Sequence, residues 1–288
     1  SRGLAKLMAQ LLEQSKGKLP ENLPSYICEA LHLMPEPLAL QEIHLPSNEN
    51  LLKAARYRLK WEELFYLQLE LLLRKGSRAR KLNGFQFTEV GEAFNEFYQK
   101  HLPFDLTGAQ KRVLKEIRKD LGVGQHMNRL LQGDVGSGKT LVALLSLLLA
   151  IGNGLQGALM APTEILANQH FIGIQELLAK MDIKVALLTG STKKSERVKI
   201  HEALLNGEIN LLIGTHALLE DTVQFKALGL VVIDEQHRFG VAQRAKMWRK
   251  NKIPPHVLIM TATPIPRTLA MTFYGDLDVS VIDELPPG

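Results

Sequence analysis

The sequence has little cysteine, no long hydrophobic run and no signal-like beginning, and each absence excludes a class of protein. Cys28 is the single cysteine among 288 residues, which excludes an internal disulfide framework and suits a reducing cytosol. The longest largely apolar run, 141–151, is too short to span a bilayer, so we expect no membrane segment. The chain starts inside a helical pattern that does not resemble a signal peptide, and we expect it to be part of a longer protein.

The composition allows a large buried core and a polyanionic partner without requiring the partner. Apolar residues make up 45% of the chain, and the length allows two domains, or one large domain with an appendage. The 35 lysines and arginines exceed the 30 acidic residues, which gives a net charge of +5. A surplus of this size permits binding to nucleic acid but does not demand it.

A glycine-rich loop that ends in lysine and threonine is the most specific motif in the chain. Residues 133–140 match the phosphate-binding pattern G-x-x-x-x-G-K-[ST], between a strand predicted over 128–132 and a helix predicted over 141–151. Glycines let backbone N–H groups approach a phosphate, and a helix N-terminus favours negative charge. Lys139 is predicted to reach the β- and γ-phosphates, and Thr140 to bind Mg²⁺. The predicted nucleotide-binding residues of the loop are Gly133, Gly136, Ser137, Gly138, Lys139 and Thr140.

Residues 1 to about 103 read as helical, without alternating strands. The longest predicted helix, 47–75, is apolar around much of its circumference, which is typical of a helix buried on more than one side between domains. A run with five basic residues follows at 74–81. It could contact a nucleic-acid backbone, but a solvated loop is favoured on composition alone. The aromatic residues between 85 and 98 could stack on bases, but this spacing is more typical of a core.

From Thr107 onward, predicted strands alternate with predicted helices. This alternation is typical of an α/β domain with a largely parallel sheet that is covered on both faces and, here, preceded by an all-α segment. Gly207 and Gly275 stand where helices are expected to end. Ligands of such sheets bind at the carboxyl ends of the strands. The predicted strands are 128–132, 156–161, 184–189, 210–214, 229–234, 257–261 and 279–283.

One buried strand delivers two adjacent acids at its end. Asp234 is predicted to hold a metal ion directly or through water, and Glu235 to orient or deprotonate the water that attacks the γ-phosphate. Alone, the pair could simply face solvent. Because the phosphate loop lies on the same predicted sheet, the metal interpretation is preferred.

Polar residues follow several other predicted strands. The hydroxyls of Thr261 and Thr263 could hydrogen-bond His237 or Glu235 and so report whether a γ-phosphate is present. Threonine side chains at two further strand ends suit phosphodiester oxygens. A glutamine before the first strand has the donor and acceptor needed to read an adenine edge. The two threonines are Thr163 and Thr215, and the glutamine is Gln110. For each of these residues alone, a helix cap is the commoner interpretation.

Together these stretches resemble the first, RecA-like motor domain of superfamily 2 helicases. Similarity to the RecG family of bacterial branched-DNA helicases lies in residues 132–140, 160–170, 234–241, 260–269 and 275–288. The related transcription–repair coupling translocases usually have glutamate where Gln236 stands. The matching motifs are the adenine-reading Gln110, motif I at 133–140, motif Ia at 161–163, a nucleic-acid motif at 214–216, motif II (D-E-x-H) at 234–237 and motif III at 261–263.

The resemblance implies a division of the chain and roles for its residues. Residues 104–288 would form the first motor domain and 1–103 a helical linker, with the wedge domain before it and the second motor domain after it both absent. ATP and Mg²⁺ are the implied cofactors, with Lys139, Asp234, Glu235 and His237 in the catalytic centre. Thr163 and Thr215 would touch the DNA backbone, and His237, Thr261 and Thr263 would couple the ATP site to movement.

The implied activity is ATP-driven fork reversal and Holliday-junction migration in DNA recombination and repair. The implied partners are double-stranded and branched DNA and single-strand-binding protein. We expect a monomer in the bacterial cytoplasm, near the nucleoid and not on a membrane. Because the second motor domain supplies an arginine finger in this family, the chain alone should bind Mg·ATP weakly and hydrolyse it barely.

Three alternative functions are considered. A transcription–repair-coupling-type translocase on duplex DNA belongs to the same class. A nucleotide-gated DNA-binding module without turnover has no need of a water-positioning acid such as Glu235. A small-molecule phosphotransferase has no role for the coupling residues at 234–237 and 261–264.

Overall fold

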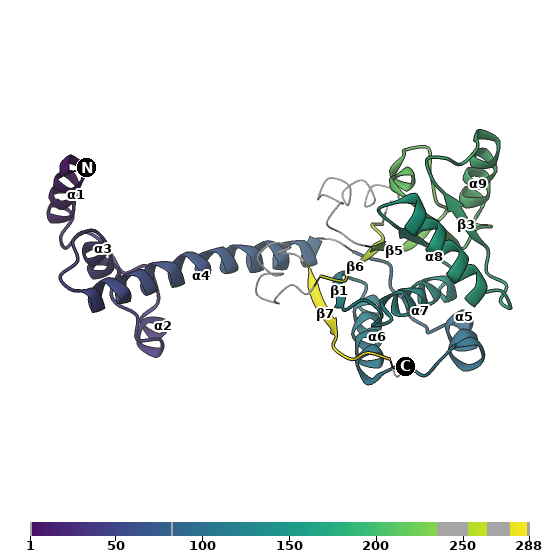
Figure 1. Ribbon diagram of the computed structural model, residues 1–288, viewed down its shortest axis with the longest axis horizontal. Helices are drawn as coiled ribbons and strands as arrows, with labels where there is room; N and C mark the ends of the chain where they lie inside the picture. Colours follow the sequence, from purple (N-terminus) through teal and green to yellow (C-terminus); the bar gives the residue numbers. More distant parts are fainter. Residues whose placement is uncertain (1, 82, 235–252, 264–276, 287–288) are drawn as a thin grey trace. The chain divides into compact units, whose positions relative to one another are not determined.

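The computed structural model describes residues 2–81, 83–234, 253–263 and 277–286 (Figure 1). The chain forms two compact units, residues 1–73 and residues 74–288. The first is helical and the second contains the sheet. The sequence predicts a boundary at residue 103, whereas residues 74–103 belong to the second unit.

The first unit consists of helices whose starts are set by proline and asparagine. Pro24 and Pro35 precede α2 and α3, with φ of −57° and −54°. Proline has no backbone N–H and is disfavoured inside a helix, so each of these helices begins after its proline. Asn48 Oδ1 accepts a hydrogen bond from Leu51 N–H at 2.9 Å, which caps α4. The bounds are α1 (Arg2–Gln14), α2 (Ser25–Ala30), α3 (Glu36–His44) and α4 (Glu49–Lys81).

Helix α4 is longer than its sequence pattern predicts. It continues past the expected end at Lys75 to Lys81, so the basic run 74–81 is helical rather than a loop. Gly76 costs about 1 kcal/mol relative to alanine, but the arginine, lysine and alanine residues around it are good helix formers. The basic side chains of this run lie outside the described residues, and their contact with DNA stays a prediction.

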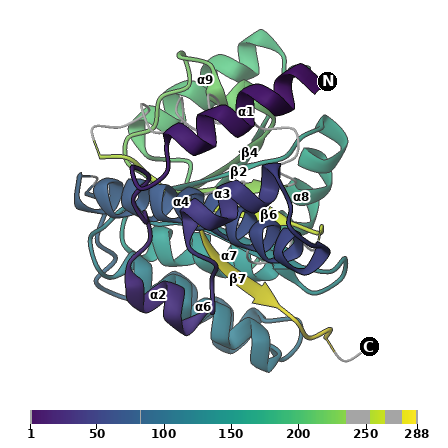
Figure 2. The same cartoon turned by 90° about the vertical axis from the view of Figure 1, so that its left-hand side faces the viewer.

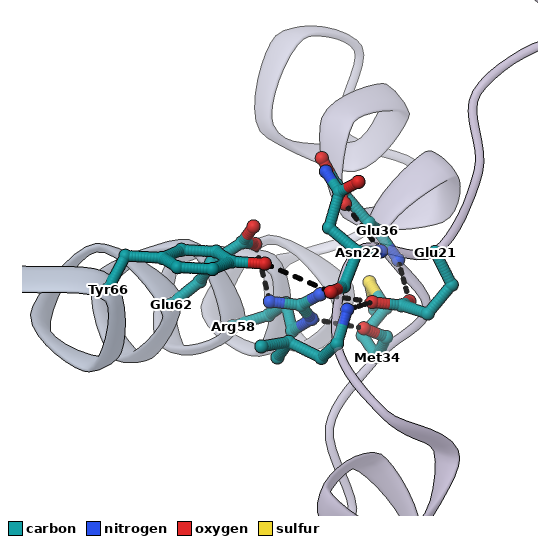
Figure 3. A network of polar contacts seen from close by, with 8 residues as sticks. Glu21, Asn22, Met34, Glu36, Arg58, Glu62 and Tyr66 are labelled. Carbon is teal, nitrogen blue, oxygen red and sulfur yellow. Dashed lines mark hydrogen bonds and ion pairs between the residues drawn. The ribbon is translucent and has the colours of Figure 1, made fainter. Parts of the chain in front are cut away.

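A buried arginine organises the first unit (Figure 3). The Arg58 side chain is 0% exposed and donates to Glu21 Oε1 and Glu62 Oε2, each at 2.5 Å. Its Nε also donates to the carbonyl oxygen of Met34 at 3.1 Å. Glu21 in turn accepts the N–H of Glu36 at 2.9 Å, at the start of α3. The network therefore ties α4 to the segments on both sides of α2.

Replacing Arg58 with methionine should unfold the first unit locally. Two carboxylates would lose their cation in a partly buried place, which costs about 3 kcal/mol or more. Amide exchange in α2 and α3 should accelerate by about 100-fold at that cost. Arg56→Met, an exposed neighbour on the same helix, is the matched control. Unchanged exchange in Arg58→Met would show that apolar packing, and not this network, holds the unit.

The second unit is built on a seven-stranded parallel sheet, and the α/β prediction is confirmed. Its order is β3-β4-β2-β5-β6-β1-β7, and all six neighbouring pairs are parallel. Each predicted strand is present within one residue or two at either end. The bounds are β1 (Asn128–Gly133), β2 (Gln156–Met160), β3 (Val185–Leu188), β4 (Leu211–Gly214), β5 (Leu228–Asp234), β6 (His256–Thr261) and β7 (Asp278–Ile282).

Helices cover both faces of this sheet (Figure 2). Buried residues of α6, α7 and α8 form one core, and those of α9 form a second core on the opposite face. Helix α9 ends at Gly207, whose φ of +80° is the left-handed cap that the sequence predicts. Gly275 lies outside the described residues. The helix bounds are α5 (Glu92–Glu96), α6 (Gly108–Leu121), α7 (Lys139–Gly152), α8 (Glu164–Leu177) and α9 (Lys194–Asn206), with short helices η1 (Phe97–His101) and η2 (His216–Leu219).

The aromatic segment before α6 packs on the sheet unit. Phe87 and Phe97 are buried in the core that contains α6 and α7. Phe94 and Tyr98 stack with ring centroids 5.7 Å apart, and Phe94 packs against the same core. The core interpretation is therefore confirmed for the phenylalanines, whereas Tyr98 is exposed. The burial of the phenylalanines explains why this segment joins the second unit.

His256 is a neutral, buried link between that segment and the sheet. It is 0% exposed, its Nδ1 accepts the N–H of Met127 at 2.9 Å, and its Nε2 donates to the carbonyl oxygen of Phe85 at 2.6 Å. A proton on Nδ1 would displace the Met127 hydrogen bond. Burial, with a smaller contribution from nearby His126, lowers the pKa of His256 to about 4, against the opposing effect of the Phe85 hydrogen bond.

His256 should make the second unit sensitive to acid. Because its pKa is about 4 when folded and about 6.5 when unfolded, the unfolded chain takes up the proton first as the pH falls. The stabilisation is complete well above pH 6.5 and falls by roughly 2–3 kcal/mol by pH 4.5. Urea unfolding at pH 8 and pH 4.5 measures this loss. His256→Asn should lose less stability between these two pH values than the wild type. His216→Asn, at an exposed histidine, is the control and should lose as much as the wild type. Equal losses in the wild type and both variants would contradict the assignment.

Candidate nucleotide site

The glycine-rich loop joins β1 to α7 at the carboxyl edge of the sheet. Gly136 and Gly138 have φ of +84° and +80°, which side chains with a Cβ adopt only with strain. A Cβ on Gly133 would lie 2.6 Å from Ser137 Oγ, and one on Gly138 would collide with the Gln110 amide. The loop is therefore a close-fitting turn at the start of a 14-residue helix, as the phosphate-binding prediction requires.

Lys139 folds its ammonium group over this loop. Its Nζ donates to the carbonyl oxygens of Gly133 and Asp134 at 2.7 and 2.8 Å. Phosphate oxygens are stronger acceptors than carbonyls for an ammonium group. Lys139 is thus placed to exchange loop carbonyls for phosphates. Ser137 Oγ is buried without a hydrogen-bond partner among the described residues, which suits a ligand with acceptor oxygens.

The side-chain amide of Gln110 is hydrogen-bonded to the glycine-rich loop. Its Nε2 donates to the carbonyl oxygen of Ser137 at 2.9 Å, and its Oε1 accepts the N–H of Thr107 at 2.9 Å. Thr107 Oγ1 accepts the N–H of Gln110 in return, which completes a capping box at the start of α6. Each end of the amide makes one hydrogen bond, and the residue is 0% exposed. The adenine contact stays a prediction and requires the buried amide to become accessible.

Asp234 is the last residue of β5 and is held by a histidine. His170 Nε2, from α8, lies 2.7 Å from Asp234 Oδ2, with both side chains more than four-fifths buried. Since an ionised carboxylate only accepts hydrogen bonds, His170 donates. The motif II prediction did not include this histidine. Glu235 and His237 lie outside the described residues, and their roles stay predictions.

Thr261 lies on the strand next to Asp234. β5 and β6 pair with Asp234 opposite Met260, so Thr261 follows one position beyond. Thr261 is 1% exposed, and its Oγ1 accepts the N–H of Thr263 at 3.1 Å. This turn places the predicted coupling residues at the same edge as the loop and Asp234. The hydrogen bonds predicted to His237 and Glu235 cannot be placed within the described residues.

A second group of polar residues lies at the ends of β2, β3 and β4. Thr163 Oγ1 caps α8 by accepting the N–H of Leu166 at 3.3 Å. Glu164 accepts the hydroxyl of Ser191 at 2.8 Å, which ties α8 to the loop after β3. Thr215 is 1% exposed, and its Oγ1 has no hydrogen-bond partner among the described residues. Its predicted contact with DNA therefore requires this segment to open, whereas Thr163 is only half-buried.

The described residues hold few groups that could bind a metal by themselves. Within the described ranges, no cluster of three or more histidine, cysteine or acidic residues forms a ready-made metal site. A single carboxylate at Asp234 and the hydroxyl of Thr140 fit Mg²⁺ that arrives with nucleotide phosphates. Every helix in the part of the chain that the structure describes is too short or too polar to cross a membrane.

Comparison with known proteins agrees with this geometry. Residues 107–272 match the model of the family described as DEAD/DEAH box helicase, and the chain belongs to this family. The chain is also similar to the curated ATP-dependent DNA helicases RecG of Synechocystis sp., Bacillus subtilis and Escherichia coli, with 52%, 48% and 46% identity over 94%, 99% and 99% of the chain. The resemblance to the RecG family is confirmed.

A solved structure supports the same relationship. The structure titled "Structure of RecG bound to three-way DNA junction" superimposes with a TM-score of 0.79, at 47% identity over 94% of this chain. The chain spans 32–42% of the length of the three curated relatives and 36% of that solved chain. It therefore corresponds to one part of proteins that are more than twice as long.

Proposed function

We propose that this chain is the first motor domain and preceding helical linker of an ATP-dependent helicase that acts on branched DNA. The proposal rests above all on the 47% identity and TM-score of 0.79 to RecG bound to a three-way junction. Fork reversal and Holliday-junction migration in recombination and repair are the proposed activities. The second motor domain and the wedge would be further parts of the same protein.

The residues at this edge of the sheet suit Mg·ATP, and a role is proposed for each. The loop glycines and the start of α7 would bind phosphate oxygens, and Lys139 would exchange the carbonyls of Gly133 and Asp134 for the β- and γ-phosphates. Thr140 and Asp234 would hold Mg²⁺, which would supply positive charge to the site. Glu235, outside the described residues, would orient the attacking water. His237, also outside them, would with Thr261 and Thr263 couple the ATP site to the DNA-binding edge.

The proposed partner is duplex DNA with a branch point. Thr163 at the start of α8, with the polar loops after β3 and β4, forms the edge that would meet the phosphate backbone. Thr215 joins that contact once its segment opens. Single-strand-binding protein is a further proposed partner, and the protein is proposed to act as a monomer in the bacterial cytoplasm near the nucleoid.

Conversion of a strand-labelled four-way junction tests this function. A full-length protein carrying this chain should separate the junction into duplexes only with ATP and Mg²⁺. Lys139→Ala and Glu235→Gln should both abolish separation of the junction, while both variants still bind DNA. A protein that displaces a bound roadblock from linear duplex but leaves the junction intact would be a transcription–repair-coupling-type translocase. ATP-dependent DNA retention without turnover would instead identify a binding module.

A further inference from the structure

His170 occupies a position in α8 where an apolar residue is expected. Ala167, His170 and Ile174 follow the i, i+3, i+7 spacing of one helix face, and the first and last are buried against the sheet. The His170 side chain is 13% exposed, so it belongs to that buried face. A polar group in such a place requires a hydrogen-bonding partner.

The partner of His170 is the carboxylate proposed to hold the metal. Nε2 of His170 lies 2.7 Å from Asp234 Oδ2, across 64 residues of sequence. The Asp234 side chain is itself 14% exposed. Oδ2 of the carboxylate is hydrogen-bonded to the histidine. No other described residue shares the carboxylate, so Oδ1 could bind a metal ion or its bound water. Side chains that hydrogen-bond metal-ligating carboxylates fix their orientation, and their loss typically costs 10–100-fold in metal affinity or activity.

We propose that His170 is a positioning residue for the Mg·ATP site and that it orients Asp234 toward the metal. The inference rests on the proposed function, because it needs Asp234 to bind Mg²⁺. His170 acts through Asp234, from a helix whose N-cap is Thr163.

The alternative is that His170 is a core residue whose hydrogen bond only supports the fold. The two roles differ in what they change. A folding role alters thermal stability and affects nucleotide binding equally with and without Mg²⁺. A positioning role reduces only the part of the binding that depends on Mg²⁺.

The test measures binding of a fluorescent, non-hydrolysable ATP analogue to this chain, with Mg²⁺ and with EDTA. In His170→Leu, the gain in affinity that Mg²⁺ provides should fall by about 10–100-fold, with affinity in EDTA unchanged. His170→Gln places an amide N–H near the original Nε2 and should recover most of the gain. Gln175→Leu, on the exposed face of α8, is the matched control and should behave as wild type.

Three results would overturn the inference alone, and a fourth would overturn the proposed function with it. An undiminished Mg²⁺-dependent gain in His170→Leu would exclude a positioning role, as would an equal loss of affinity in Mg²⁺ and in EDTA. A His170→Gln protein that folds, by its thermal melting curve, but binds no better than His170→Leu would do the same. If wild type and Lys139→Ala bind the analogue equally, with no gain from Mg²⁺, the proposed function itself fails, and the inference fails with it.

Discussion

Replacing Lys139 with alanine is expected to lower the affinity for Mg·ATP by at least about 100-fold and to abolish ATP turnover. The ammonium group of Lys139 lies against the loop, with its Nζ 2.7 and 2.8 Å from two loop carbonyl oxygens. Each charge-assisted hydrogen bond to a phosphate is worth about 1.5–3 kcal/mol, and two such bonds give at least this effect. Titration of the fluorescent ATP analogue measures the affinity, and phosphate release measures turnover.

Lys111→Ala is the matched control for this variant. Lys111 is an exposed lysine on α6, and within the described ranges it makes no ion pair. Its removal changes the net charge by the same amount and should leave both affinity and turnover at the wild-type level. If Lys139→Ala kept wild-type affinity, the glycine-rich loop would be a structural turn and the proposed nucleotide site would be lost.

The chain alone is expected to hydrolyse ATP about 10³–10⁵-fold more slowly than a full-length protein that carries it. An arginine finger contributes this factor in related phosphoryl transfer, and the resemblance to the RecG family assigns the finger to the second motor domain. The chain also covers only 42% of the length of RecG from Bacillus subtilis, which can serve as a full-length comparator. Both proteins are assayed for phosphate release with saturating four-way junction.

Background ATPase is the main source of error in this comparison. Lys139→Ala in the same chain sets that background, because it removes the proposed site without removing a contaminating enzyme. Turnover by the wild-type chain should exceed this background slightly. Turnover within tenfold of the full-length protein would mean that the residues needed for hydrolysis all lie in this chain, and that the finger is not required.

The sheet could be predicted from the sequence because most of its strands are buried. β5 is buried up to Ile233 and reads as a continuous apolar run. β1 is also buried along its whole length, although Asn128, Arg129 and Gln132 interrupt its apolar pattern. The loop at 133–140 could be predicted because the phosphate-binding geometry depends on local spacing. The end of α4 could not be predicted, because a single glycine at position 76 resembles a helix stop although the helix continues.

Parts of the site depend on contacts that spacing does not reveal. His170 and Asp234 are 64 residues apart and meet only when α8 packs on the sheet. The capping box of Thr107 and Gln110 follows the T-x-x-Q signature, and the helix-cap interpretation of Gln110 is confirmed. The adenine contact of the same amide stays a prediction. The burial of Thr215 depends on the packing of the segment after β4, which its flanking residues do not encode.

ATP turnover by a full-length protein carrying this chain, measured with no DNA, with linear duplex and with a four-way junction, tests the central claim most directly. We predict strong stimulation by the junction, weaker stimulation by linear duplex of equal length, and loss of both in Lys139→Ala and Glu235→Gln. Equal stimulation by junction and linear duplex would contradict the assignment to branched DNA. Turnover that no DNA stimulates would contradict the assignment of a DNA motor and leave only a nucleotide site.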